Sequence, residues 1–247
     1  MQMLRGEEHP DTISAMANLA NTLGDQGKLA EAAKIKSEVL DKRRRILGEE
    51  HPSTISAMAN FANTLGDQGK LAEAAEMKSE VLDKIRRILG EEHPDTISAM
   101  ANFANTLGDQ GKLAEAAEMK SEVLDKRRRI LGEEHPDTIL AMNNLANTLG
   151  DQGKLAEAAE MKSEVLDKRR RILGEEHPDT ISAMANLAIT LVDQGKLDDA
   201  ASLSKFAYMQ MAKAPEMDST SRISSASMKF TVSVTKRSSR MEVQIEV

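Results

Sequence analysis

The sequence has 247 residues, a formal net charge of −7 and no cysteine. The absence of cysteine excludes a disulfide framework and a thiolate metal site. The negative net charge argues against general affinity for nucleic acid. Aromatic residues make up only 2% of the chain and tryptophan is absent. The core must therefore consist of aliphatic residues, methionine and alanine, which pack well between helices, and the composition predicts an all-α fold.

The N-terminal segment shows no sign of a secretion signal, because MQMLRGEEHP lacks an apolar core. No stretch approaches the roughly 20 apolar residues that a membrane helix needs. We therefore expect a cytoplasmic protein that binds no membrane. Since MQMLRGEEHP matches the end of RRRILGEEHP in the later part of the chain, we also expect the chain to begin inside a longer array.

A period of 42 residues organises the chain, and each period contains one histidine followed by proline, at His9, His51, His93, His135 and His177. Segments 48–89 and 90–131 differ at two positions only, where Ser53 and Ile85 stand for Asp95 and Arg127. Repeats of this length stack so that each unit contacts only its neighbours. The period therefore predicts five stacked units.

The first half of each unit predicts a helix, as in HPDTISAMANFANTL of the third unit. Proline suits the first helical position because its missing N–H would be unpaired there anyway, which makes His93 the N-cap, and Asp95 suits the positive end of the helix dipole. Apolar residues recur at helical spacing and predict a buried stripe of Ile97, Met100, Ala104 and Leu107. Equivalent helices are expected at 10–24, 52–66, 94–108, 136–150 and 178–192.

The second half predicts another helix, antiparallel to the first. In GDQGK, Gly111 can adopt the left-handed conformation that reverses the chain. Second helices are expected at about 28–46 and every 42 residues onward, the last ending near Lys213. The predicted core positions of the third unit are Leu113, Ala116, Met119, Val123 and Ile130. The run KRRR is interpreted as a solvated helix end that matches the helix dipole, rather than a nucleic-acid patch.

The segment NLANTLGDQGKLAEA (Asn18–Ala32) resembles the tetratricopeptide repeat. The residues that match its large and small helix positions and its turn glycine are Met16, Leu19, Ala20, Leu23, Gly27, Leu29 and Ala32. The period exceeds the usual length of about 34 residues. It is similar to the kinesin light chain type, and more similar still to the C-terminal arrays of fungal NLR-like receptors. The resemblance covers residues 1–213 and implies a right-handed superhelical solenoid of five antiparallel helix pairs.

The sequence departs from the family pattern in two ways. Lysine replaces the large ring of the second helix, at Lys36, Lys78, Lys120 and Lys162. We expect each lysine to lay its stem on apolar surface and to keep its ammonium group in water. The chain also contains no GxxxxGK[ST] motif, so a receptor's nucleotide switch would have to lie outside it.

Asparagines form a polar stripe on the first helices. In the first unit Ser14, Asn18, Asn21 and Asp25 share one face, and asparagine costs up to about 0.7 kcal/mol relative to alanine in a helix. The resemblance implies that this face lines a concave groove, where amides bind an extended peptide; the alternative is a structural ladder of asparagines between helices. Acidic residues at the edge favour a neutral or basic peptide. The candidate groove residues are Asn18, Asn21, Asn60, Asn63, Asn102, Asn105, Asn144, Asn147 and Asn186.

No pattern predicts catalysis, a metal or a cofactor. The histidines lack a second histidine three or four residues away, whereas zinc needs three or four convergent ligands. Serines such as Ser14 and Ser37 recur with the period, whereas a catalytic group is needed once. We therefore expect no enzyme.

The tail, residues 214–247, is rich in serine, and Pro215 near its start breaks the helix. KFTVSV and MEVQIEV alternate apolar and polar residues on either side of TKRSSR, which predicts a β-hairpin. An isolated hairpin is marginal in water, so we expect weak order unless it packs on Ile189 and Val192 of the last first helix.

Together these features predict an interaction scaffold that binds an extended peptide or a partner protein in the groove. The first alternative is a ligand-sensing fragment of a larger NLR-like signalling receptor, and a distant alternative is a hydrolase. Expected partners are proteins or peptides and not nucleic acid or membrane, with self-association through the array ends as a further expectation.

Overall fold

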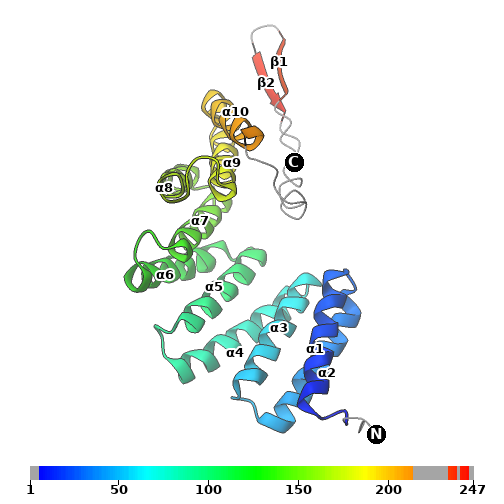
Figure 1. Cartoon of the computed structure of the whole chain (residues 1–247). Coiled ribbons are helices and arrows are strands. Elements are labelled where there is room, and N and C mark those ends of the chain that lie inside the picture. The colour runs from blue at the N-terminus through cyan, green and yellow to red at the C-terminus, as the bar shows by residue number, and fades with distance from the viewer. Residues whose placement is uncertain (1–5, 214–232, 238–239, 245–247) are drawn as a thin grey trace. The chain divides into compact units, whose positions relative to one another are not determined.

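The computed structural model describes residues 6–213, 233–237 and 240–244. In this part of the chain ten helices follow one another, and first helices of 16 residues alternate with longer second helices (Figure 1). The first helices are α1 (Pro10–Asp25), α3 (Pro52–Asp67), α5 (Pro94–Asp109), α7 (Pro136–Asp151) and α9 (Pro178–Asp193). The second helices are α2 (Leu29–Leu47), α4 (Leu71–Leu89), α6 (Leu113–Leu131), α8 (Leu155–Leu173) and α10 (Leu197–Lys213). Each lies within one residue of its predicted start.

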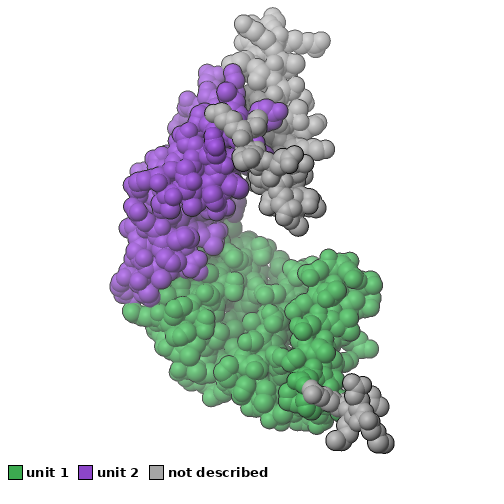
Figure 2. Space-filling model, viewed as in Figure 1, with its two compact units in different colours: residues 1–126 green, residues 127–247 purple. Residues whose placement is uncertain are grey.

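The chain forms two compact units, residues 1–126 and residues 127–247 (Figure 2). In the first unit consecutive helices pack on one another from the pair α1 and α2 to the pair α4 and α5, and in the second unit from the pair α7 and α8 to the pair α9 and α10. The predicted all-α array of helix pairs is thereby confirmed. The right-handed superhelical path stays a prediction.

A histidine caps the N-terminus of each first helix, as predicted. Nδ1 of His93 accepts a hydrogen bond of 3.1 Å from the backbone N–H of Asp95, and proline occupies the first helical position. The other four first helices begin in the same way. Because the imidazole satisfies one of the N–H groups that every helix start leaves unpaired, the recurrence of His-Pro is explained by capping.

Glycine makes the turn between the helices of a pair. Gly111 has a φ of 77°, its N–H donates to the carbonyl of Gly108, and the N–H of Lys112 donates to the carbonyl of Leu107 at 2.9 Å. This pair of hydrogen bonds is the Schellman motif, which requires the left-handed conformation at one residue.

In the first unit the core is apolar and runs from the first repeat into the second. One cluster joins α1 to α4 through Ile13, Val39, Leu40, Ile55, Ala57, Met58 and Val81. The predicted stripe of α5 is fully buried. In α6, however, Ile130 was predicted to be buried and is 41% exposed, whereas Leu124 is buried at 2%. The prediction was wrong because Ile130 lies in the last turn of α6, next to the C-terminal residue of the helix, where the helical spacing no longer implies burial.

Polar side chains bind neighbouring repeats together. Nε2 of Gln68 donates to the carbonyl of Leu29 at 2.9 Å, and Nζ of Lys36 donates to Oγ1 of Thr64 at 2.8 Å. Lys78 and Lys162 form the same bond, to threonines of α5 and α9. The expectation that the ammonium group lies in water was therefore wrong for Lys162, which is buried at 8%, whereas Lys36 and Lys78 are half-buried.

Burial lowers the pKa of the three lysines, Lys36, Lys78 and Lys162. For Lys78 the loss of water is the largest effect, and the carboxylates of Asp109 and Asp67 offset part of it. The charged ammonium group is thus held at a cost that the nearby acids reduce.

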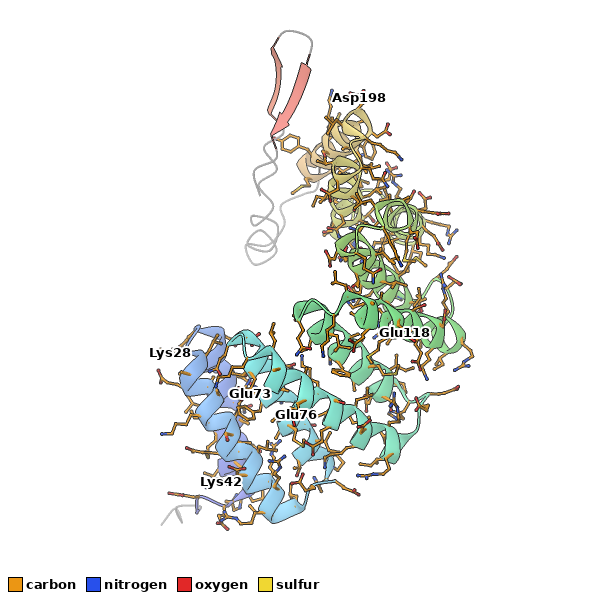
Figure 3. The ribbon with its side chains drawn as sticks, turned by 180° about the vertical axis from the view of Figure 1, so that it is seen from behind. Lys28, Lys42, Glu73, Glu76, Glu118 and Asp198 are labelled. Carbon is orange, nitrogen blue, oxygen red and sulfur yellow. The ribbon has the colours of Figure 1, made fainter. Side chains whose placement is uncertain are left out.

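The basic ends of the second helices pair with the acidic loops. Nε of Arg86 lies 2.8 Å from Glu91, and Nζ of Lys126 lies 3.4 Å from the same glutamate. Lys42, labelled in Figure 3, lies 3.8 Å from Glu7 in the corresponding pair of the first repeat. These contacts explain the KRRR runs as ion-pairing helix ends, each pair contributing about 0–1 kcal/mol at an exposed site.

The tail contains an antiparallel pair of strands, β1 (Ser233–Arg237) and β2 (Arg240–Gln244), with Val234 opposite Val243. The predicted loop at 235–240 was too long, because Thr235–Arg237 belong to β1 and Arg240 belongs to β2. The predicted serine-rich stretch at 214–232 lies outside the described residues.

A pair of glycine substitutions tests the turn. Gly111→Ala should lower the free energy of unfolding by about 1 kcal/mol, because an L-residue is strained at positive φ. Gly108→Ala is the matched control: it lies in α5, its added Cβ would meet the Ala116 Cβ at 3.9 Å, and it should raise stability by about 0.5–1 kcal/mol. Urea denaturation measures both; a Gly111→Ala variant as stable as Gly108→Ala would contradict the turn.

A second substitution tests the buried lysine. Lys78→Met should be at least as stable as wild type at pH 7, since the Thr106 hydroxyl still donates to the Asn102 carbonyl. A lysine whose folded pKa is lowered destabilises the fold below that pKa, and the cost disappears as pH rises towards the unfolded value of 10.5. The stability difference between variant and wild type should therefore shrink between pH 7 and pH 10 in urea titrations. A difference that grows over this range would mean that the ammonium group stabilises the interface.

Candidate functional site

The predicted groove residues all lie on the first helices, and we call them the asparagine face. It comprises Asn18, Asn21, Asn60, Asn63, Asn102 and Asn105 in the first unit and Asn144, Asn147 and Asn186 in the second. The six asparagines of the first unit are exposed, as is Asn147, whereas Asn144 and Asn186 are half-buried. Because the two asparagines of a helix are three residues apart, they share one face.

The asparagine side chains make no hydrogen bond to another residue within the described part of the chain. Their backbone carbonyls do bond: the Asn60 carbonyl accepts from Oγ1 of Thr64, and that of Asn102 accepts from Thr106. The alternative of a hydrogen-bonded asparagine ladder is therefore not supported by the geometry. Each amide retains a donor and an acceptor for water or for a ligand.

The asparagine face borders a hollow of about 360 Å³ between α3, α4 and α5. Asn63 and Asn102 line it together with Ser56 and Ser98 of the same polar stripe. Its volume lies above the lower limit of roughly 300 Å³ for ligand sites in proteins. The first unit thus brings predicted residues from two helices to one cavity.

A second, much smaller hollow of about 20 Å³ lies between α1, α2 and α3. Asn21 and Asn60 line it, beside Lys36 and Arg43. Space of this size holds about one water molecule. Asn18 and Asn105 line neither hollow.

The asparagine face presents side-chain amides, and carboxylates lie next to them. Asp67 and Asp109, at the ends of α3 and α5, are exposed, and the cationic Lys78 between them is engaged with Thr106. Within the described residues no three His, Asp or Glu side chains converge in a way that could hold a metal ion. In the same part of the chain no helix is long and apolar enough to cross a membrane.

The chain is similar to a known protein family and to solved structures. The model of the tetratricopeptide repeat family matches residues 11–84, 62–129, 109–171 and 140–208. Among curated proteins no sequence matches.

Solved structures share the fold. A putative kinesin light chain from Podosopora anserina with nearly identical TPR-like repeats is 25% identical, with a TM-score of 0.75 over 85% of this chain and 100% of that one. A variant of that protein with one substituted residue is 23% identical, with the same TM-score over 85% of this chain and 98% of that one. BtubC (BKLC) from P. vanneervenii is 19% identical, with a TM-score of 0.69 over 85% of each chain.

The resemblance to the kinesin light chain type of repeat is thereby confirmed, while the resemblance to fungal NLR-like arrays and self-association through the array ends stay predictions. The family matches cover nearly all of α1 to α10, and the helix pairs, turn glycines and period agree with them. The chain belongs to the tetratricopeptide repeat family.

Proposed function

We propose that the chain is an interaction scaffold that binds an extended segment of a partner protein along the asparagine face of its first helices. Tetratricopeptide repeats generally mediate contacts between proteins, and the family therefore supports the scaffold role. The extended segment and its position on this face are the finer part of the proposal.

The observation that carries it is the unused bonding capacity of the asparagine amides. They are exposed in α1, α3 and α5, and they bond to no other residue in the described ranges, although asparagine weakens each helix by up to about 0.7 kcal/mol relative to alanine. A side-chain amide offers one acceptor and two donors, which match the N–H and C=O groups of a peptide backbone. An extended peptide presents such groups along its whole length, whereas a folded partner has satisfied most of its own.

The charges of the face favour a peptide that is neutral or basic. Lys36 and Lys78 donate to threonines, so their ammonium groups are not directed at a terminal carboxylate. The exposed carboxylates of Asp25, Asp67 and Asp109 lie at the ends of the same first helices. Binding should therefore weaken with added salt when the peptide is basic, because exposed charges are screened.

The proposal is tested by replacing Asn60, Asn102 and Asn144 together with alanine. The ligand is first obtained by selecting a random dodecapeptide library on the wild-type chain, and its dissociation constant is measured by fluorescence anisotropy. We expect the triple variant to bind at least tenfold more weakly, since each lost bond to the peptide contributes about 1 kcal/mol. Its thermal stability should hold or rise, because alanine is the better helix former.

The matched control is Glu73→Ala with Glu76→Ala, two exposed residues of α4 (Figure 3), which should leave the affinity unchanged. Full affinity in a stable triple variant would remove the asparagine face from the account. A loss of stability by about 0.5–1.5 kcal/mol per site would instead show that the asparagines support the fold.

A further inference from the structure

One position of the repeat changes character in the second repeat. In three other repeats it is an arginine that donates to a backbone carbonyl in the first turn of the next first helix. Arg43 Nη1 lies 2.8 Å from the Ser53 carbonyl, and Arg127 and Arg169 make equivalent bonds to Asp137 and Asp179 at 2.9 and 2.8 Å. In the second repeat the residue is Ile85, which cannot make this bond.

The two hollows of the first unit occupy equivalent places in successive repeats. Every residue that lines the small hollow has its counterpart, 42 positions later, in the lining of the large one. Six of these seven pairs are identical residues, and the seventh is Arg43 against Ile85. The hollow beside Arg43 has a volume of about 20 Å³, whereas the hollow beside Ile85 has about 360 Å³ and extends further, to residues such as Ile88 and Ser98 whose counterparts do not line the small one.

The walls of the large hollow separate into an apolar part and a polar part. The apolar part consists of aliphatic side chains, those of Ile55, Val81, Ile85, Ile88 and Ala99. The polar part consists of hydroxyl and amide groups from α3 and α5, those of Ser56, Asn63, Ser98 and Asn102. This arrangement fits one apolar side chain in the hollow while the backbone that carries it bonds to the polar groups.

The charge of the hollow also differs between the two repeats. The small hollow is lined by two cationic residues, Lys36 and Arg43, whereas Lys78 and Asp95 line the large one and balance each other. Lys78 donates to Thr106, and the Asp95 side chain is 72% exposed. The accessible charge at the large hollow is therefore the carboxylate, which is complementary to a basic residue.

We propose that the hollow around Ile85 is a specificity pocket that takes one large aliphatic side chain of the bound peptide, with a basic residue beside it. This inference rests on the proposed peptide-binding function and names the chemistry of the ligand. Because the first, third and fourth repeats carry arginine at this position, the pocket fixes where along these repeats the peptide's aliphatic residue binds. Ile85 is thus a specificity-determining residue.

The test compares two probe peptides, acetyl-GSKLKSG-amide and acetyl-GSKAKSG-amide, by NMR titration of the isoleucine methyl groups. In the wild-type chain the leucine peptide should bind about tenfold more tightly than the alanine peptide and should shift the methyls of Ile55, Ile85 and Ile88. A third probe with glutamate for both lysines should bind more weakly, because of Asp95.

Ile85→Arg is the decisive variant. It should fold, because three other repeats contain arginine at this position, and it should reduce the tenfold preference for leucine to about one. Ile85→Leu should retain the preference. Arg43→Ile is the converse variant. It should enlarge the equivalent hollow between α1 and α3 and add a second site that prefers the leucine peptide.

The outcomes separate the pocket from the asparagine face. Equal affinities for the two peptides in wild type, or an unchanged leucine preference in Ile85→Arg, would overturn the pocket while peptides selected from the library still bound the face. A leucine preference that depends on Ile85 and survives replacement of the three asparagines would support the pocket and overturn the proposed role of the amides.

Discussion

The whole structure depends on one constraint: a pair of helices with short turns cannot bury its apolar surface alone. Met58 of α3 is fully buried only because the core cluster draws residues from α1, α2 and α4 as well. Each repeat therefore completes the core of its neighbour, and stability in such arrays is a sum of repeat and interface terms. A repeated sequence makes each interface fit the next one, which is consistent with the close repetition along the chain.

The polar contacts follow from the same constraint. When a first helix packs on the preceding pair, it covers side chains such as Lys36 and Gln68, and these must find partners because unpaired buried polar groups are costly. The Thr64 hydroxyl and the carbonyl of Leu29, the first residue of α2, supply those partners. These contacts occupy the lysines of the interface, so the groups that remain exposed on the first helices are the asparagine amides with the serines and aspartates beside them. The interface residues thus hold the repeats together, while the polar stripe is free to bind.

Variation at a single interface position can still alter the binding face. Ile85 packs against the apolar cluster and at the same time leaves open the space that Arg43 fills in the preceding repeat. Isoleucine in place of arginine at this position thus makes the second repeat differ locally from the repeats that carry arginine.

The sequence predicts the helix bounds closely because proline, glycine and apolar spacing act locally: α5 was expected at 94–108 and spans Pro94–Asp109. Properties that depend on what packs on a residue are harder to predict. Ile130 continues the helical spacing of Val123, but it lies in the last turn of α6 and is exposed. The Lys78 ammonium group was expected in water because only a neighbouring repeat could cover it. The Ile85 substitution is visible in the sequence, yet the space that it leaves could not be predicted without the side chains around it.

The most direct test of the account is the state of the asparagine side-chain amides before and after a peptide binds. Their protons can be followed by NMR in the wild-type chain, with and without a peptide selected from a random library. The account predicts fast exchange with water in the free chain and marked slowing for Asn60, Asn63 and Asn102 on binding, while the backbone amides of α3 and α5 stay unchanged. Side-chain amides that are already protected in the free chain, or that remain unaffected when the peptide binds, would contradict it.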